Sequence, residues 1–160
     1  MIKKIIKLDK RHLDDLAIID FESEHQNSSK LFNKHQMVQE IKKRFKKKHE
    51  LFFGYKQGKE LVGYVTLKPF FPGHNHCEVY WLAVKKKMQG QGIGSKLMNF
   101  IENYAKKKGF RKLYLYTGED MILTQKFYTK NGYEIINKFK EYYGYKKGNT
   151  TAVLLCKKLK

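Results

Sequence analysis

Residues 89–95 read Gln89-Gly90-Gln91-Gly92-Ile93-Gly94-Ser95 and lie between a strand-like apolar stretch, residues 77–84, and a helix-like stretch that begins at Ile93. Three alternating glycines remove Cβ atoms from this turn, so that backbone N–H groups can point into one space close to a ligand. The following helix adds unpaired N-terminal donors and roughly half a positive charge from its dipole. The turn is therefore predicted to bind a phosphate or pyrophosphate group; the alternative is a flexible glycine turn without a ligand.

The residues around these glycines argue against two common nucleotide-binding motifs. A Walker loop ends in Gly-Lys-Ser/Thr, whereas Gly94 is followed by Ser95-Lys96 in the reverse order. The dinucleotide fingerprint needs a third glycine three residues after the second, inside a parallel β-α-β unit that opens the fold. Here Gly94 comes two residues after Gly92, and the preceding strand follows a predicted hairpin. Nucleotide hydrolysis and hydride transfer are therefore disfavoured.

Outward from the turn, hydrophobic patterning predicts strands and helices in a defined order. Ile93, Leu97, Ile101 and Ala105 recur every four residues, which predicts a helix that is apolar along one side. Asn33 and Gln36 resemble a capping box at the start of an earlier helix. Strands are predicted near residues 2–8, 50–56, 60–68, 77–84, 112–117, 133–140 and 150–159, and helices near 13–20, 33–45, 93–108 and 121–132. The predicted order is βααβββαβαββ.

Length and composition predict one compact globular domain over residues 1–160, because 160 residues with 41% hydrophobic content can bury a real core. No apolar run is long enough to span a membrane, and residues 1–10 are too short and lysine-rich for a signal peptide. A cytoplasmic location is therefore expected. Cys77 and Cys156 lie in separate apolar stretches without a CxxC pair, so we expect buried free thiols, no disulfide and no metal site.

The chain carries 34 basic and 15 acidic residues, a formal net charge of +19. Such a charge alone would suggest nucleic acid or another anionic partner. Only Arg11, Arg44 and Arg111 are arginines, however, and base and phosphate recognition favours the arginine fork. Lysines are spread through every segment, which favours a solvated lysine-rich surface over a nucleic-acid site. The alternative is an anion-attracting face at residues 42–48.

Two motifs, in register with this order of elements, resemble the GCN5-related N-acetyltransferase (GNAT) family. Gln89-x-x-Gly92-x-Gly94, preceded by Leu82-Ala83-Val84 and followed by the helix from Ile93, is similar to the acetyl-CoA signature of that family. FYTKNGY, residues 127–133, resembles its second hallmark, Phe-Tyr-x-Lys-x-Gly-Phe. The resemblance covers nearly the whole chain. It implies an α/β (α+β) fold in which four helices flank a mixed, mostly antiparallel sheet of about seven strands.

The resemblance also implies an activity, the direct transfer of the acetyl group of acetyl-CoA to a primary amine of a small molecule, a polyamine or a protein. Leu82, Ala83 and Val84 would pair their backbone with the pantetheine arm. Tyr128 matches the tyrosine whose hydroxyl lies near the CoA sulfur. The pyrophosphate would be wrapped by the turn, that is by Gln89, Gly90, Gln91, Gly92, Ile93, Gly94 and Ser95.

This chemistry needs a base, since a lysine-like ammonium with a reference pKa near 10.4 is neutral in only about one part in a few thousand at pH 7. Glu78 is the predicted base, because it begins EVYWLAV and would share a strand face with Tyr80 and Leu82 unless a bulge intervenes. The histone-acetylating branch of the family has a glutamate at the matching place. The alternatives are a solvent-side glutamate and a chain of waters acting as the base.

Tyr128 is predicted to give a proton or a hydrogen bond to the leaving thiolate, and the alternative is a core tyrosine beside Phe127. A nucleophilic Cys77 is disfavoured because alternation turns it away from Glu78. His74 and His76 lack a third metal ligand at suitable spacing, and contact with the acceptor is the other reading.

The chain departs from the family pattern at two places. Met121 stands where many members have an asparagine, which puts one cofactor contact in doubt. Residues 113–117 read Leu-Tyr-Leu-Tyr-Thr instead of the Leu-Glu-Val-Arg run of the branch that acetylates ribosomal-protein N-termini, so that branch is disfavoured.

The acceptor itself is not identified by the sequence. Asp20, Glu22 and Glu24 would form an acidic rim for a polyamine or a lysine side chain, or would be ordinary surface carboxylates. The aromatic loop at residues 142–145 would be an acceptor wall, a homodimer contact or ordinary strand packing. The alternative to an enzyme is a non-catalytic basic module on the same fold, acting as a CoA sensor or binding nucleic acid.

Overall fold

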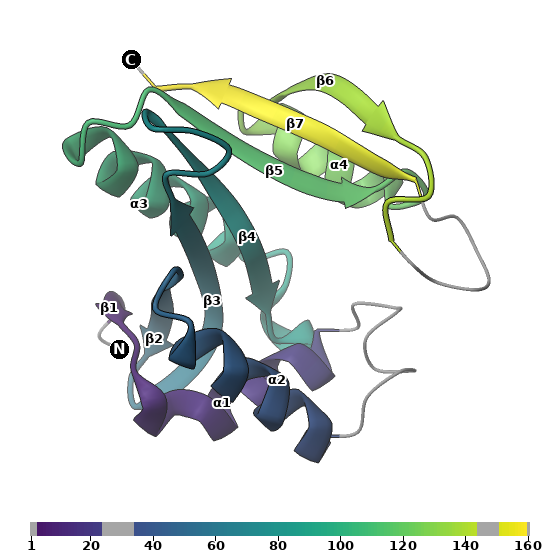
Figure 1. Ribbon diagram of the computed structural model, residues 1–160. Coiled ribbons are helices and arrows are strands. Elements are labelled where there is room, and N and C mark those ends of the chain that lie inside the picture. Colours follow the sequence, from purple (N-terminus) through teal and green to yellow (C-terminus); the bar gives the residue numbers. More distant parts are fainter. Residues whose placement is uncertain (1–2, 24–33, 144–150, 160) are drawn as a thin grey trace. The chain divides into compact units, whose positions relative to one another are not determined.

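The computed structural model describes residues 3–23, 34–143 and 151–159 of the chain (Figure 1). The predicted order of strands and α-helices is confirmed. The elements are β1 (Lys3–Lys7), α1 (Leu13–Glu22), α2 (Lys34–Lys46), β2 (Leu51–Gln57), β3 (Glu60–Pro69), β4 (His76–Val84), α3 (Ile93–Lys107), β5 (Lys112–Gly118), α4 (Ile122–Lys130), β6 (Glu134–Phe139) and β7 (Ala152–Lys158). Asn33, the predicted cap of the second helix, lies outside the described residues.

The strands form one seven-stranded sheet in the order β1-β2-β3-β4-β5-β7-β6. β4 and β5 are parallel, whereas β1–β2, β2–β3, β5–β7 and β6–β7 are antiparallel pairs. The predicted mixed, mostly antiparallel sheet is therefore confirmed.

Residue contacts divide the chain into two compact units, which are described separately below. Unit 1 comprises residues 1–69 and 79–104, and unit 2 comprises residues 70–78 and 105–160. β4 begins in unit 2 and continues into unit 1 after Glu78. A single domain over residues 1–160 stays a prediction.

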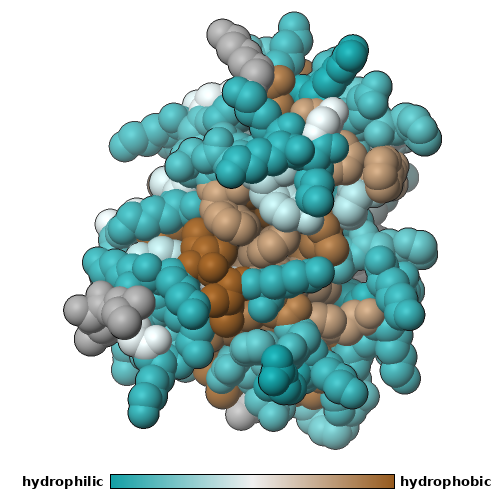
Figure 2. All heavy atoms as spheres, turned by 90° about the vertical axis from the view of Figure 1, so that its left-hand side faces the viewer, coloured by the Kyte–Doolittle hydropathy of each residue, from teal (hydrophilic) through white to brown (hydrophobic). Residues whose placement is uncertain are grey.

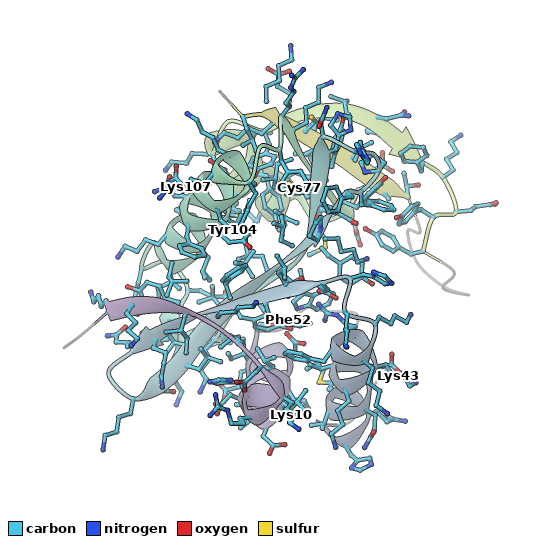
Figure 3. All side chains as sticks on the ribbon, turned by 60° about the vertical axis from the view of Figure 1, so that its left-hand side comes forward. Lys10, Lys43, Phe52, Cys77, Tyr104 and Lys107 are labelled. Atoms are coloured by element: carbon cyan, nitrogen blue, oxygen red, sulfur yellow. The ribbon has the colours of Figure 1, made fainter. Side chains whose placement is uncertain are left out.

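In unit 1, α1 and α2 pack against one face of β2 and β3. Phe52 stacks on Phe45 of α2 with ring centroids 4.0 Å apart, and Figure 3 labels Phe52 on the side of the sheet that faces these two helices. Leu16, Ile19, Ile41 and Tyr64 complete this core and are essentially inaccessible to solvent. The apolar positions of both helices thus point inward, as their spacing predicts.

The helix α3 covers the opposite face of the unit 1 strands. Phe53 of β2 contacts Phe100 and Tyr104 of α3, with ring centroids 5.2 and 4.9 Å apart. Ile93, Leu97 and Ile101 are buried along the same helix. The predicted apolar side of the helix after the glycine turn is therefore confirmed.

In unit 2, side chains alternate between a closed and a more open face of the strands. Leu113 and Leu115 of β5 and Val153 and Leu155 of β7 are fully buried on one face. Their neighbours Tyr114, Tyr116 and Leu154 are only half-buried on the other. Figure 1 shows α4 running alongside β5, β6 and β7.

Hydrophilic side chains make up most of the surface visible in Figure 2, in keeping with the expected solvated, lysine-rich exterior. Within the described segments, no helix has the length and apolar character needed to cross a membrane.

Candidate functional site

The glycine turn of unit 1 adopts a backbone conformation that requires glycine. Gly90 and Gly92 both have φ near +74°, in the left-handed region that L side chains rarely occupy. A Cβ built on either glycine would meet no protein atom within 4 Å, so the turn borders open space. The helical ladder of α3 begins with Lys96 N–H donating to Gly92 O at 3.1 Å. The N–H groups of Ile93, Gly94 and Ser95 therefore have no acceptor within the helix.

Side-chain hydrogen bonds hold the turn in place. Gln89 Nε2 donates to Val84 O at 3.0 Å and to Ser23 O at 3.3 Å, which ties the turn to the end of β4 and to the end of α1. Gln91 Nε2 donates to Lys87 O at 3.2 Å. Both glutamine side chains are thus engaged with the protein, and the backbone of the turn is what remains to meet a ligand.

Gly63 of β3 is a site residue that the sequence reasoning missed. A Cβ on Gly63 would lie 3.0 Å from Ala83 O, 3.2 Å from Val84 Cγ2 and 3.4 Å from Ile93 Cγ2. A side chain at this position would therefore push its neighbours in β4 and α3 back by a few tenths of an ångström, whereas glycine allows β3 this close approach. The available signal was a glycine inside an apolar strand, which often marks a close backbone approach.

The last residues of β4 follow the predicted strand but not a regular alternation. Ala83 is buried, and Leu82 and Val84 are half-buried. The Arg44 guanidinium lies 5.1 Å from the ring centroid of Tyr80 and 5.6 Å from that of Trp81. Adjacent side chains of a regular strand point to opposite faces and could not share one guanidinium. Regular alternation therefore does not hold at Tyr80 and Trp81, and a face shared by Glu78, Tyr80 and Leu82 stays a prediction.

Asp20 is a buried carboxylate and not part of an acidic rim. It is 5% exposed and accepts hydrogen bonds from Tyr64 Oη at 2.7 and 2.8 Å and from Trp81 Nε1 at 2.9 Å. Burial, with the Asp20 charge second, raises the pKa of Tyr64 well above its ordinary value, so the phenol stays a donor. Glu22 is exposed, and Glu24 lies outside the described residues.

Arg44 also lies inside unit 1, away from the lysines that flank it in sequence. Its guanidinium donates to both carboxylate oxygens of Glu50, with Nε at 3.0 Å from Oε2. The guanidinium carbon also lies 5.2 Å from the Phe52 ring centroid. Burial by itself would lower the pKa of Arg44, but the hydrogen bonds that Arg44 donates to Glu50 and the charges of nearby acidic groups outweigh burial and raise the pKa above its ordinary value. The predicted anion-attracting face at residues 42–48 therefore consists of exposed lysines without Arg44.

Glu78 lies near the start of β4, in unit 2, and is only 5% exposed. The alternative of a solvent-side glutamate is therefore wrong. Its Cα pairs with Tyr114, and Cys77 pairs with Leu113, so the two β4 side chains point to opposite faces as predicted. Burial first and the Glu78 carboxylate second raise the pKa of Tyr116, which lies two residues beyond Tyr114 on the same strand face.

Tyr128 is a buried residue of α4 with an accessible surface of 7%. Its ring contacts those of Phe127 and Tyr133 at centroid distances of 5.1 and 5.9 Å. Burial, with Tyr143 as a second cause, raises the pKa of Tyr128 well above the usual value for a phenol. The hydroxyl therefore stays protonated at neutral pH and is able to donate a hydrogen bond.

The structure disfavours Cys77 as a nucleophile. Burial raises the pKa of the Cys77 thiol to about 12, so the reactive thiolate is scarce near pH 7. His76 packs its ring on Tyr114 at 5.3 Å. Among residues 3–23, 34–143 and 151–159, no group of three His, Cys, Asp or Glu side chains could hold a metal ion.

The sequence pattern described as the acetyltransferase (GNAT) family matches residues 14–133, and the chain belongs to that family. "Probable N-acetyltransferase 14" of Xenopus tropicalis is 38% identical over 58 residues, which are 36% of this chain and 28% of that protein. The chain thus aligns with well under a third of that curated relative.

Solved structures share the fold over nearly the whole chain. A probable acetyltransferase from Staphylococcus epidermidis has a TM-score of 0.84 and 18% identity, covering 99% of this chain and 100% of that one. The ribosomal-protein-S18-alanine N-acetyltransferase of Escherichia coli has a TM-score of 0.79 and 17% identity over 99% and 94%. PaiA N-acetyltransferase of Thermoplasma acidophilum, solved with coenzyme A, has a TM-score of 0.73 and 23% identity over 99% of both chains.

Proposed function

We propose that the protein transfers the acetyl group of acetyl-CoA directly to a primary amine of a small molecule or a protein. The observation that carries this proposal is the turn at residues 89–95. Its two left-handed glycines border open space, and three backbone N–H groups at the start of α3 have no helical acceptor. Such an arrangement suits the pyrophosphate of acetyl-CoA, because backbone donors and the helix dipole both favour negative charge.

The proposed cofactor-binding residues are Leu82, Ala83 and Val84 for the pantetheine arm and the turn from Gln89 to Ser95 for the pyrophosphate. Membership of the acetyltransferase family supports this assignment. Because the side-chain amides of Gln89 and Gln91 already donate to backbone carbonyls of the protein, the backbone N–H groups of the turn are the proposed donors to the pyrophosphate.

The proposed chemistry needs three proton transfers. Glu78 accepts the first proton from the acceptor ammonium, directly or through water, so that the neutral nitrogen can attack the thioester carbonyl. The new C–N bond forms, the nitrogen gives its second proton to solvent as the C–S bond breaks, and Tyr128 gives a proton to the leaving sulfur and regains one from solvent, which leaves the amide and free CoA. The burial of both side chains supports these roles. A proton donor or acceptor interacts more strongly with charge that develops beside it when water is excluded.

The first test combines a screen of amine acceptors with a variant of the turn. Wild-type protein should release free CoA from acetyl-CoA only when a suitable primary amine is present. Gly92→Val should weaken acetyl-CoA binding in calorimetry by at least about tenfold, because valine is strained at positive φ and fills the space that the ligand needs.

Gly109→Val is the matched control for this variant. Gly109 also has a positive φ, +83°, and open space around its Cβ, but it lies at the other end of α3. It should lose similar stability and keep its acetyl-CoA affinity. Equal affinities of wild type and folded Gly92→Val would show that the turn is not the cofactor site.

A further inference from the structure

The open face of unit 2 carries an aromatic cluster next to the buried Glu78. Glu78 pairs with Tyr114 across β4 and β5, so both side chains point to one face, and Tyr116 lies two residues further on the same face. Gly118 pairs with Ala152 of β7, and Ala152 pairs with Phe139 of β6. The register therefore places Phe139 on the face of Glu78 and Tyr116.

The rings of Tyr116, Phe139 and Tyr142 neighbour one another on this face. Tyr116 stacks on Tyr142 with centroids 5.0 Å apart and planes inclined by 13°. Phe139 lies 6.2 Å from both rings. Tyr116, Phe139 and Tyr142 are called the aromatic wall below.

The aromatic wall is more exposed than a core cluster of this size would be. Phe139 is 38% exposed and Tyr142 is 48% exposed, whereas Leu113 and Leu115 on the opposite face of the same sheet are buried. Contiguous exposed apolar surface commonly marks a binding site, because hydrating it is unfavourable. The wall thus has the character of a surface that contacts another molecule.

The charge beside the wall selects the chemistry of that molecule. Glu78 lies on the same strand face as Tyr116 of the wall, and the negative faces of aromatic rings attract cations. The same face also carries His76, Lys112 and Lys158, which pair across β4, β5 and β7. These residues lie beyond Glu78 in the direction away from Tyr116, so the negative region on this face is limited to the part next to the wall. An anionic ligand would meet a carboxylate there, whereas an ammonium ion would meet a carboxylate and aromatic rings.

A fourth ring adjoins the aromatic wall. Tyr142 contacts Tyr143 with ring centroids 5.1 Å apart and nearly perpendicular planes. The aromatic surface of unit 2 therefore extends as far as Tyr143.

We infer that the aromatic wall of Tyr116, Phe139 and Tyr142 binds the acceptor and selects acceptors that arrive as alkylammonium cations. This inference rests on the proposed acetyl transfer. The rings hold the methylene groups next to the ammonium, and Glu78 receives the proton that the ammonium must lose. Amines attached to an anionic or strongly polar group are disfavoured by the same contacts.

The first experiment compares the binding of a charged and an uncharged molecule of the same shape, neither of which can be acetylated on nitrogen. Choline and 3,3-dimethylbutan-1-ol differ only in a quaternary nitrogen in place of a carbon. Titration of the full chain, followed by backbone NMR shifts at residues 114–118 and 139–143, should give about 3- to 30-fold tighter binding of choline. Equal affinities, or shifts confined to other residues, would overturn the inference.

The second experiment uses variants of Tyr142 with the amines found in the acceptor screen. Tyr142→Ala should raise KM for alkylamines by about 3- to 30-fold, with kcat and KM for acetyl-CoA nearly unchanged, and Tyr142→Phe should restore most of the loss because it keeps the ring. Leu123→Ala is the control, since Leu123 is an 82% exposed apolar residue of α4 outside the wall. An acceptor KM that is the same in wild type and Tyr142→Ala would overturn the inference.

Two other outcomes separate this inference from the proposed function. If wild type acetylates alkylamines but Tyr142→Ala changes only the oligomeric state, the wall is a self-association surface and the inference is wrong while acetyl transfer stands. If no amine is acetylated, the proposed function fails, and the choline preference still decides whether the wall recognises a cation.

Discussion

Glu78 combines a charged side chain with a position that solvent hardly reaches. If it accepts the proton of the acceptor, Glu78→Gln keeps the shape and removes the basicity, so the acetylation rate at neutral pH should fall by roughly 10²-fold. The loss should shrink as the pH rises from about 6.5 to 9.5, because a growing fraction of the amine is already neutral. The measurement is the ratio of wild-type to variant kcat/KM across that range, and a flat ratio near one would exclude Glu78 as the base.

Tyr128→Phe provides the contrast within the same experiment. Burial and Tyr143 raise the pKa of Tyr128 well above the usual value, so its hydroxyl does not titrate between pH 6.5 and 9.5. Loss of a proton donor to sulfur should therefore lower kcat by a factor that stays constant with pH. A Tyr128→Phe loss that shrinks with rising pH in the same way as the Glu78→Gln loss would contradict the proton-donor role of Tyr128.

At the scale of elements, Asp20 joins α1 to β3 and β4. Asp20→Ala leaves the Tyr64 hydroxyl and the Trp81 indole N–H without this acceptor in the core, so the free energy of unfolding should fall by about 1–3 kcal/mol for each donor left unsatisfied. Adding Tyr64→Phe should recover part of that loss, since the orphaned hydroxyl is then removed. Denaturant titration measures all three variants.

Glu22→Ala is the control for these variants, because Glu22 is exposed at the end of the same helix. It should change the unfolding free energy by less than about 0.5 kcal/mol. If Asp20→Ala is no more destabilising than Glu22→Ala, or if the two core changes are strictly additive, the hydrogen bonds do not stabilise unit 1.

Element order was predictable because it depends on local patterns. The four-residue spacing of Ile93, Leu97 and Ile101 fixes the buried side of α3 whatever the rest of the chain does. The positive φ of Gly90 and Gly92 likewise follows from a turn that needs glycine. The glycine turn and the burial of the apolar runs could therefore be inferred without coordinates.

The contacts that sequence reasoning missed are all non-local. Asp20 looked like one of several surface carboxylates, and nothing in its own segment shows that Tyr64 and Trp81 donate to it. Arg44 sits in a run of lysines, and only the fold brings Glu50, Phe52 and Tyr80 around it. The shared contact of Tyr80 and Trp81 with Arg44 similarly breaks an alternation that the sequence suggests.

For the whole molecule, the net charge of +19 has to be reconciled with a cationic acceptor. Exposed charges are largely screened beyond about 8 Å at physiological ionic strength. The lysines therefore repel an ammonium only weakly at a distance, whereas in the proposed complex Glu78 and the aromatic wall would act in contact with it. The same charge attracts acetyl-CoA, which carries several negative charges.

This charge also favours weak, non-specific nucleic-acid binding, whose salt dependence would distinguish it from the proposed function. We predict that duplex DNA binds without sequence preference, in the range of about 10⁻⁴ to 10⁻⁶ M at physiological salt, and loses affinity steeply as salt rises. Acetyl-CoA should keep most of its affinity at salt concentrations that abolish the DNA complex, because backbone N–H groups of the turn hold it at short range. Titrations of both ligands between about 50 and 500 mM salt check this. Sequence-specific DNA or RNA binding tighter than about 10⁻⁸ M, with no binding of acetyl-CoA, would instead identify a basic nucleic-acid module on the same fold.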